Sequence, residues 1–352
     1  MTKQTKGITL IALVITIIVL LILAGVTIVT LTGDNGLLQK TNEAKNTTIE
    51  AEGLERIKLA VMTSHDRNGI DTTSLAKNLS QINNLTDLNN KAIEESTEIT
   101  LPKIIKLNNT TYEINADGEV YKYYNTDGLL LLLDGINNTR NGHSTTTTTW
   151  EDLSGNNNDF TKLDSASNAL WSDNSYVGDA TNRTLVLNKA ILENSNECTV
   201  EVCYDIPKFN NNYIWIFQSR QKVNPANGFQ FNVSPNNREI CLWTGKNNSN
   251  YHSLSNFKNL TDLGKRTEAF SVGSNNIIFS DDLQFYNEDI EEGIINSVMQ
   301  RDFYSIGSAY PWSGTNYSFK GNIYSIRVYN RKLSEDELKN NYEIDRSRFN
   351  MD

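Results

Sequence analysis

Carboxylate, imidazole and thiol side chains are the groups in this chain that could do chemistry. The three histidines, His65, His143 and His252, lie far apart and do not have the spacing of metal ligands. The acidic runs at 281–282 and 288–292 lack the alternation that would place two carboxylates on one strand face, as glycoside hydrolysis requires. We interpret both runs as turns. The sequence therefore predicts no catalytic residue and no enzyme activity.

One oxygen-rich stretch suggests calcium as a cofactor. Calcium binds several carboxylate and amide oxygens at once, and four such side chains stand close together: Asp152, Asn156, Asn158 and Asp159. The same residue types also form turns, because Asn and Asp tolerate left-handed backbone conformations and cap backbone groups. Both interpretations are open, and we favour the turn.

Aromatic side chains beside Asn, Ser and Gly suit stacking on sugar rings. We predict ligand contacts for the aromatic residues in loop-like stretches: Trp171, Tyr251, Tyr310 and Trp312. Trp150, Trp215 and Trp243 lie at or in expected strands, where packing in the core is the usual role of an aromatic residue.

The cysteines favour buried free thiols, with one disulfide left open as the alternative. Three cysteines, Cys198, Cys203 and Cys241, allow at most one intramolecular pair. Cys198 and Cys203 have opposite strand parity and should face opposite sides of a sheet. Cys203 and Cys241 can pair only if their strands are neighbours.

Charge and hydropathy divide the chain into two parts. The 352 residues carry 42 acidic and 32 basic groups, yet residues 8–31 hold no charge. A helix of that length spans roughly 36 Å, enough to cross a hydrocarbon core of about 30 Å. Lys3 and Lys6 favour a cytoplasmic N-terminus, so the sequence predicts a single-pass membrane protein whose bulk is extracellular. The acidic remainder argues against nucleic acid as a partner.

The residues at the start of this run indicate a more specific role than that of a plain membrane anchor. Lys6, Gly7 and Ile8 open the apolar run, and this order resembles the class III signal of type IV pilins and pseudopilins. The resemblance implies that a prepilin peptidase cuts after Gly7, and that the helix contacts lipid and then other pilin subunits. Ala12 stands where that family usually has Glu, which leaves filament membership open.

The next segment, 34–125, predicts a small pilin-like or stalk region. Apolar residues at helical spacing from Leu37 to Val61 predict an amphipathic helix that ends near 65–69. Asn- and Thr-rich sequence follows, with order or disorder over 66–110 left open. Tyr112 and Ile114, a turn at 117–118 and Val120 then predict a hairpin.

From residue 126 the pattern changes to short alternating strands, as in 200–206, 229–233 and 324–328. Period-2 alternation over this length predicts a β-sandwich. One late helix is expected, because Ser334 and Glu337 form a capping box, flanked by Leu333 and Leu338 as a hydrophobic staple.

The two ends of this region resemble the laminin-G-like, concanavalin A-like lectin/glucanase jelly roll. The matching stretches are 127–129 with 150–159, and 319–334, where a strand leads into a short capped helix. The resemblance covers roughly 127–352 and implies a jelly-roll fold, which in some members binds calcium at rim loops.

Together these observations predict a mostly β chain in four parts. They are a leader (1–7), a transmembrane or assembly helix (8–33), the pilin-like region (34–125) and the jelly roll (126–352). The expected function is a membrane-anchored or pilus-associated bacterial surface protein that displays a lectin-like domain for adhesion to a glycan or protein. A minor pilin with a structural role is the alternative, and a carbohydrate-active enzyme is less favoured.

Overall fold

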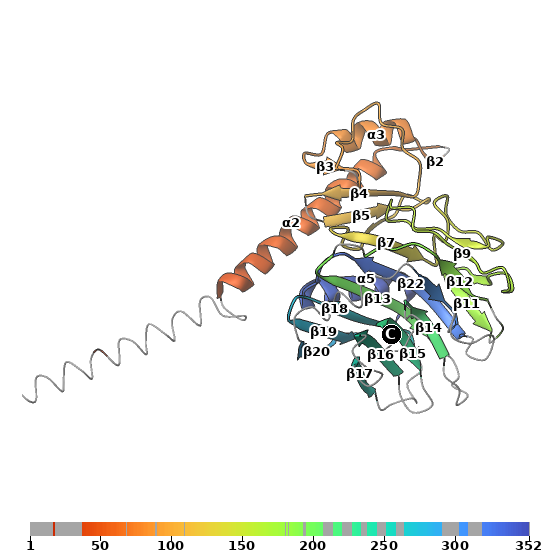
Figure 1. Ribbon diagram of the computed structural model, residues 1–352. Helices are drawn as coiled ribbons and strands as arrows, with labels where there is room; N and C mark the ends of the chain where they lie inside the picture. The colour runs from red at the N-terminus through yellow and green to blue at the C-terminus, as the bar shows by residue number, and fades with distance from the viewer. Residues whose placement is uncertain are drawn as a thin grey trace, which may run out of the picture. The chain divides into compact units, whose positions relative to one another are not determined.

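The chain forms two compact units, Met1–Tyr121 and Lys122–Asp352 (Figure 1). The computed structural model describes residues 17, 37–67, 69–88, 90–108, 110–179, 181, 183–192, 195–206, 214–219, 227–233, 238–244, 251–257, 264–290, 303–308 and 319–351. The boundary between the units lies four residues before the predicted one at 125/126.

The first unit combines helices with a sheet of order β3-β4-β5-β6. Its described elements are α2 (Leu37–Met62), β1 (His65–Asp66), β2 (Gly69–Ile70), α3 (Thr72–Ser80), β3 (Leu85–Thr86), β4 (Lys103–Leu107), β5 (Thr110–Ile114) and β6 (Val120–Lys122). The predicted helix and hairpin are both present. The open question over 66–110 is answered by α3, β3 and β4, which belong to this unit.

The apolar face of α2 is shorter than the sequence pattern predicts. Ile57 and Val61 are completely or almost completely buried, but Ala51 is exposed. Helix α2 approaches β4 closely at Gly53, where a Cβ atom would lie 2.9 Å from a methyl group of Leu107. Glycine therefore permits this packing.

Helix α3 was not predicted, although its sequence contains a start signal. Asp71 is the N-cap, and its Oδ1 accepts a hydrogen bond from the Thr73 amide at 3.0 Å. Such a cap satisfies one of the unpaired amides at a helix start. Leu75 and Leu79, four residues apart, face the core of the first unit.

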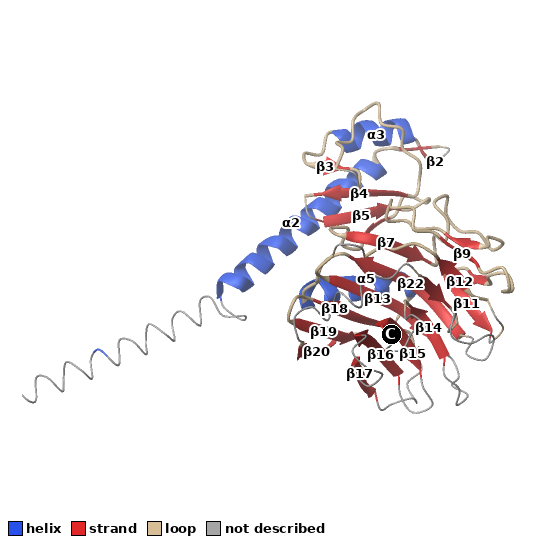
Figure 2. Ribbon diagram, viewed as in Figure 1, coloured by secondary structure: helices blue, strands red, loops and turns tan. Residues whose placement is uncertain are grey.

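The second unit is a sandwich of two sheets, with one helix, α5 (Glu335–Phe349), among its described residues (Figure 2). Sheet A has the order β10-β11-β22-β13-β18-β19-β20, and β7 lies beside β22. Its strands are β7 (Leu129–Asp134), β10 (Trp171–Ser172), β11 (Ser175–Asp179), β13 (Cys198–Asp205), β18 (Arg266–Val272), β19 (Asn276–Asp281), β20 (Gln284–Asp289) and β22 (Lys320–Tyr329).

Sheet B has the order β17-β16-β15-β14-β21-β12-β9-β8. Its strands are β8 (Thr149–Trp150), β9 (Phe160–Lys162), β12 (Leu185–Leu187), β14 (Ile214–Gln218), β15 (Asn227–Val233), β16 (Arg238–Thr244), β17 (Tyr251–Phe257) and β21 (Tyr304–Ile306). The predicted β-sandwich is thus confirmed.

The inner faces of both sheets form one hydrophobic core. Val200 and Phe270 of sheet A meet Phe217, Phe229 and Phe231 of sheet B in this core. Phe229 lies 5.3 Å, centroid to centroid, from both Phe217 and Phe270, in edge-to-face contacts that favour aromatic packing. The alternation of the strands therefore places their other side chains on the outer faces of the sandwich.

Helix α5 begins as predicted. Ser334 Oγ accepts a hydrogen bond from the Glu337 amide at 3.3 Å, and Glu337 Oε2 accepts one from the Ser334 amide at 2.9 Å. Leu333 and Leu338 are buried, as a hydrophobic staple requires. The helix ends at Asn350, which has a positive φ of 51°.

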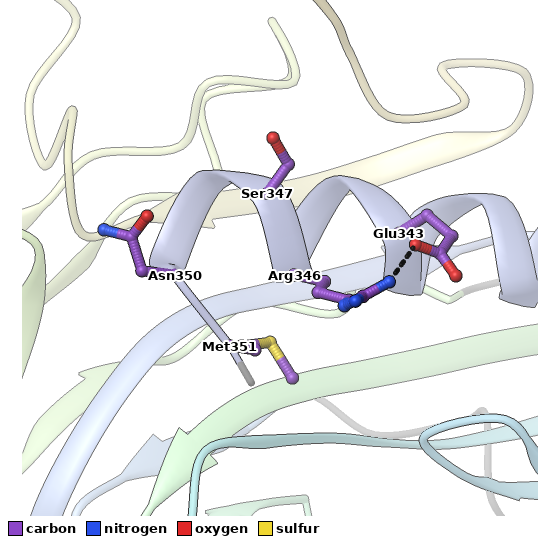
Figure 3. Close-up of a pocket in the computed structure, with 5 residues that line it drawn as sticks. All are labelled: Glu343, Arg346, Ser347, Asn350 and Met351. Atoms are coloured by element: carbon purple, nitrogen blue, oxygen red, sulfur yellow. Dashed lines mark hydrogen bonds and ion pairs between the residues drawn. The ribbon is translucent and has the colours of Figure 1, made fainter.

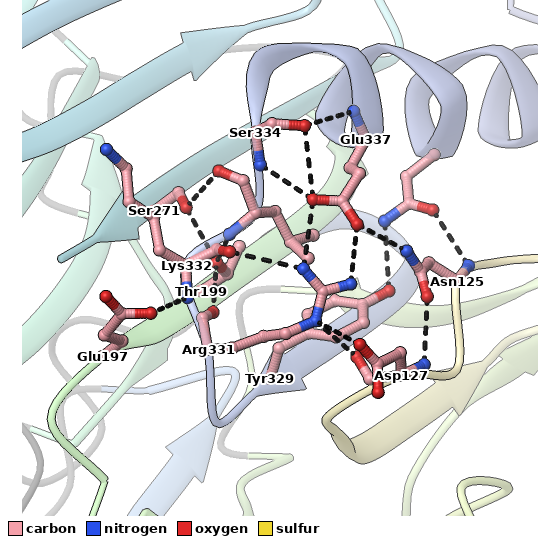
Figure 4. Close-up of polar contacts among 12 residues, drawn as sticks. Asn125, Asp127, Glu197, Thr199, Ser271, Tyr329, Arg331, Lys332, Ser334 and Glu337 are labelled. Atoms are coloured by element: carbon pink, nitrogen blue, oxygen red, sulfur yellow. Dashed lines mark hydrogen bonds and ion pairs between the residues drawn. The ribbon is translucent and has the colours of Figure 1, made fainter.

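The two stretches that resemble the lectin/glucanase family meet at this helix start (Figure 4). Arg331 forms ion pairs with Glu337 at 2.7 Å and with Asp127 at 3.2 Å. Thr199 Oγ1 donates to the Arg331 carbonyl and accepts from the Leu333 amide, both at 2.9 Å. These contacts join the beginning and the end of the sandwich to the centre of sheet A.

Candidate functional site

The predicted calcium residues lie together in one hydrogen-bonded loop. Asp152 is buried, and its Oδ1 accepts from the amides of Leu132 at 3.0 Å and Ser154 at 2.9 Å. Its Oδ2 accepts from Ser154 Oγ and from the Asn158 amide, both at 2.9 Å. The Asn156 amide group donates to the Leu129 carbonyl at 3.1 Å. This loop therefore fixes the start of β7.

Cations of the chain itself contact the remaining oxygens. Lys189 Nζ donates to Asn158 Oδ1 at 2.8 Å, and Arg140 forms an ion pair with Asp159. Among the described residues, no group of three or more His, Cys, Asp or Glu side chains is arranged to hold a metal ion. The geometry thus follows the turn interpretation, and calcium stays a prediction.

Trp171 is part of the core, which corrects the prediction that it stacks on a ligand. The residue is 7% exposed, and its indole N–H donates to the Thr147 carbonyl at 2.9 Å. Its ring packs edge-to-face against Trp150 at 5.3 Å and against Tyr176 at 5.8 Å. Trp150 is fully buried, as expected.

The other predicted sites lie outside the described residues. Tyr310 and Trp312 are among these, and at Tyr251 only the start of β17 is described. The processing residues Lys6, Gly7 and Ile8 also fall there, as does Ala12. Cleavage after Gly7 and contact with pilin subunits therefore stay predictions.

The predicted location as a single-pass membrane protein is corrected. In the part of the chain that the structure describes, no helix has the length and apolar character needed to cross a bilayer. Of the predicted span, only Ile17 belongs to that part.

All three cysteines are buried free thiols, as predicted. Cys198 belongs to the core between the sheets, whereas Cys203 lies on the outer face of sheet A against Tyr324 and Phe349. Cys241 lies in sheet B, so its strand does not neighbour that of Cys203. Burial raises the pKa of Cys198 and of Cys203, which keeps both thiols protonated and unreactive.

The outer face of sheet A holds a buried network of charges. Arg327 is completely buried, its Nε lies 2.9 Å from Glu201 Oε2, and its Nη1 and Nη2 donate to the two oxygens of Asp345 at 2.8 and 2.7 Å. The Tyr124 ring covers the guanidinium at 4.2 Å, and its hydroxyl donates to Asp345 at 2.7 Å. Asn341 of α5 donates to Glu201 at 2.7 Å.

Each member of this network has several partners. Desolvation raises the pKa of Glu201 against the opposing effect of Arg327. Desolvation also opposes the charge on Arg327, but Asp345 and Glu201 outweigh it and hold the pKa of Arg327 well above its usual value. The network attaches α5 to the sheet, so we assign it a structural role.

A groove of about 440 Å³ lies at the C-terminal end of α5 (Figure 3). It is lined by Glu343, Arg346, Ser347, Asn350 and Met351. Glu343 and Arg346 form an ion pair at 3.3 Å, and Lys265 Nζ donates to the Phe349 carbonyl at 2.7 Å. Its charged groups thus have partners within the chain, and no predicted site residue lines it.

The outer face of sheet B carries an uncharged polar row that sequence analysis missed. Residues paired directly across neighbouring antiparallel strands share one face of a sheet. By register, one such row, polar except at Val186, runs from β8 to β16: Thr149, Thr161, Val186, Ser305, Gln218, Gln230 and Cys241. We call these residues the sheet B row.

The sheet B row passes from solvent into the protein. Thr161 is exposed, whereas Ser305 and Gln218 are completely buried and Gln230 is 5% exposed. Gln218 Nε2 donates to Ser305 Oγ at 3.0 Å, so the amide and the hydroxyl are linked across β14 and β21.

Asn232 and Trp215 lie beside the row on the same face. They pair across β15 and β14, and their exposed fractions are 2% and 9%. The side-chain nitrogen of Asn232 is buried and has no hydrogen-bond partner among the residues that the structure describes. Native structures leave few buried polar groups unpaired, and such a group marks a position where a ligand or water can bind.

The sequence held a signal for this face. In β15, Gln230 and Asn232 alternate with Phe229 and Phe231, so an aromatic inner face implies an amide outer face. The aromatic residues alone predict the strand, whereas the amides between them indicate a polar outer face.

Comparison with known proteins identifies no family. No family model matches the chain, and no curated protein matches it. Among solved structures, three similar ones are botulinum neurotoxin domains. The binding domain of botulinum neurotoxin DC in complex with rat synaptotagmin II has a TM-score of 0.48 at 12% identity, over 62% of this chain and 52% of that chain.

The receptor binding domain of botulinum neurotoxin D gives a TM-score of 0.47 at 17% identity, over 62% and 53% of the two chains. The serotype D ligand binding domain in complex with N-acetylneuraminic acid gives 0.45 at 15% identity, over 62% and 51%. This chain spans about half the length of these structures. At these values the likeness goes no further than a β-rich architecture.

Proposed function

We propose that the second unit is a non-catalytic binding module that recognises a neutral, hydroxyl-rich ligand of the glycan class on the outer face of sheet B. The observation that carries the proposal is the Asn232 side-chain nitrogen, a donor that is buried beside the sheet B row and has no partner in the described part of the chain. A ligand acceptor at this point would offset the cost of leaving that donor desolvated.

The chemistry of the face favours sugar hydroxyls. Each primary amide offers two N–H donors and an acceptor oxygen, and each sugar hydroxyl both donates and accepts. Gln218, Gln230 and Asn232 place three such amides on neighbouring strands. The sheet B row contains no charged residue, so an ionic ligand would be desolvated there without a counter-charge. Beside the row, Glu239 of β16 is the register partner of Asn232 on the same face, so an anionic ligand would meet a like charge there. The face therefore suits a neutral ligand rather than an anionic one.

The sandwich provides a rigid support for these amides. Their strands also carry Phe217, Phe229 and Phe231, which pack in the core between the sheets. Side chains on rigid elements keep their geometry without a ligand, which reduces the entropy cost of binding. Thr161 marks the end of the row that is open to solvent.

A glycan array tests the proposal with the full-length chain. Neutral and sialylated glycans are compared on the array, and binding constants for the hits are measured by titration calorimetry. Replacing Asn232 by Ala should weaken the binding of neutral glycans about tenfold, because the ligand loses a hydrogen bond. Gln218→Ala should also weaken it, because this variant removes the hydrogen bond to Ser305 that helps to position the row. Gln284→Ala is the matched control, since it removes an exposed amide on β20.

The outcomes separate the ligand classes. Neutral glycans that bind the native chain and lose affinity only with the Asn232 and Gln218 variants would support the proposal. Exclusive binding of sialylated glycans, equal binding by all variants, or no glycan binding at all would overturn it. Binding of a protein ligand alone, insensitive to Asn232→Ala, would also overturn it.

A further inference from the structure

Strand β20 ends sheet A and is exposed on both of its faces. It follows β19 in a hairpin, and among the described strands it pairs with β19 alone. Five of its six residues are exposed, including Tyr286, and only Phe285 is half-buried. Its side chains therefore add little to the core of the second unit.

The register shows which backbone groups of β20 point away from β19. The Ile290 amide donates to the Asn275 carbonyl at 2.8 Å, and pairs alternate between bonded and non-bonded along an antiparallel ladder. Gln284, Tyr286 and Glu288 are therefore the bonded positions. The amides and carbonyls of Phe285, Asn287 and Asp289 point away from β19, to the edge at which no described strand pairs.

This edge carries acidic side chains but few other features that prevent strand pairing. Natural edge strands are protected by proline, by charged side chains or by a β-bulge. β20 contains no proline, its register with β19 runs regularly over six pairs, and its charges, Glu288 and Asp289, repel an acidic strand but not a basic one. Asn287 Nδ2 also donates to Glu335 Oε1 of α5 at 2.8 Å, which holds the strand in place. The edge is thus a preformed template for a further strand.

The acidic residues of β20 and of the sequence that follows it determine which kind of partner strand can pair there. Glu288 and Asp289 end the strand, Glu291 and Glu292 follow in the sequence, and residues 267–300 contain no Lys or Arg. Lys332 approaches the neighbouring strand β19, where its Nζ donates to Asn276 Oδ1 at 2.7 Å, so the four acidic residues outnumber it. A second copy of this chain would bring like charges together, because the chain has a net charge of −10. A basic segment is complementary to this edge.

We infer that β20 docks an extended, lysine- or arginine-bearing segment of a partner protein, which joins sheet A as an added strand. Backbone hydrogen bonds to Phe285, Asn287 and Asp289 supply the affinity of such an addition, and side chains supply its specificity. This surface is separate from the sheet B row, so either proposal can fail without the other.

Fluorescence anisotropy of labelled peptides with the full-length chain tests this inference. The probe is a short peptide of alternating lysine and threonine. One control peptide carries glutamate in place of lysine, and another carries backbone N-methyl groups at alternate residues. The unmodified probe should bind about tenfold more tightly than either control, because each control lacks the charge or the edge hydrogen bonds.

Two variants of Asn287 distinguish the contribution of its backbone amide to binding from that of its side chain. Asn287→Pro removes an edge-facing amide that β19 does not use and should weaken binding about tenfold, whereas Asn287→Ala keeps that amide and should bind as the native chain does. If the N-methylated peptide binds as tightly as the probe, the edge-pairing hypothesis is wrong. This conclusion does not depend on whether the proline variant folds. Absence of probe binding, or equal binding of the glutamate peptide, would also overturn the inference.

Discussion

The two outer faces of the sandwich bury polar groups in different ways. On sheet A, Arg327 lies between Glu201 and Asp345, and every one of these charges has several hydrogen-bond partners. On sheet B, the row is uncharged, and the amide nitrogen of the neighbouring Asn232 has no partner among the described residues. One face is a completed network, and the other contains a buried donor that a ligand could satisfy.

We expect the outer face of sheet A to serve stability and the outer face of sheet B to serve recognition. A buried polar network that is fully satisfied makes the fold specific, but it has no donor left for a ligand. A buried donor without a partner costs stability and is retained where it serves another purpose. Changes to each face should therefore have opposite effects on the free energy of unfolding.

The largest effect is expected from removing the central cation of sheet A. Arg327→Met leaves the carboxylates of Glu201 and Asp345 buried without their counter-charge, which should cost about 3–5 kcal/mol of stability. Urea denaturation of the full-length chain measures this loss.

The control for this variant is Arg346→Met. Arg346 forms an exposed ion pair with Glu343, and its loss should change stability by about 0–1 kcal/mol. Similar losses for the two variants would show that the buried network has no special role.

A matched pair of asparagines compares the two faces directly. Asn341 donates to Glu201 and to the Tyr329 hydroxyl, so Asn341→Leu should destabilise the fold by about 1.5–3 kcal/mol. Asn232→Leu removes a donor that has no partner, and it should leave stability unchanged or raise it by up to about 1 kcal/mol.

Denaturation curves of both leucine variants, with glycan binding measured in parallel, check this pair. We expect Asn232→Leu to lose ligand binding while keeping its stability. A large destabilisation by Asn232→Leu would show that this amide is needed for folding.

The smallest effect concerns the pH dependence at the start of α5. Desolvation raises the pKa of Glu337, but hydrogen bonds from Arg331 and Ser334 outweigh this effect and hold the pKa below its usual value of 4.5. A carboxylate with a lowered pKa stabilises the fold above its unfolded pKa, and this contribution disappears as the pH falls through the folded pKa. For this partly exposed group we expect about 0.5 kcal/mol.

Glu337→Gln isolates that contribution, because glutamine keeps the capping box and does not titrate. The difference in unfolding free energy between native chain and variant should shrink as the pH falls below 4.5. A difference that stays constant with pH would contradict a role for the charge of Glu337.

Local patterns in the sequence predicted the elements of the fold well. The capping box at Ser334 and Glu337 depends on residues three apart, and strand alternation needs only neighbouring residues. Burial of Trp171 was mispredicted, because its partners Trp150 and Tyr176 come from other strands, and residues beside it say little about them.

The candidate site depends on contacts that the sequence does not specify locally. Gln218 and Ser305 are 87 residues apart, and Glu201 and Arg327 are 126 apart. Only the register of the sheets places each pair on one face. A prediction from strand alternation identifies which residues point outward, but not which outward residues are neighbours.

The pairing of β7 with β22 has a consequence for how the second unit folds. These strands are the first and the last of sheet A along the chain, and Leu133 pairs with Ile326. Closing so long a loop is slow, and synthesis delivers the N-terminal strands first. Strand β22 lies between β7 and β13 and pairs with both. These two strands therefore lack this shared neighbour until almost the whole unit has been synthesised. We expect a nascent chain that lacks β22 to depend on chaperones, since the hydrophobic strands on either side of β22 would have no partner between them.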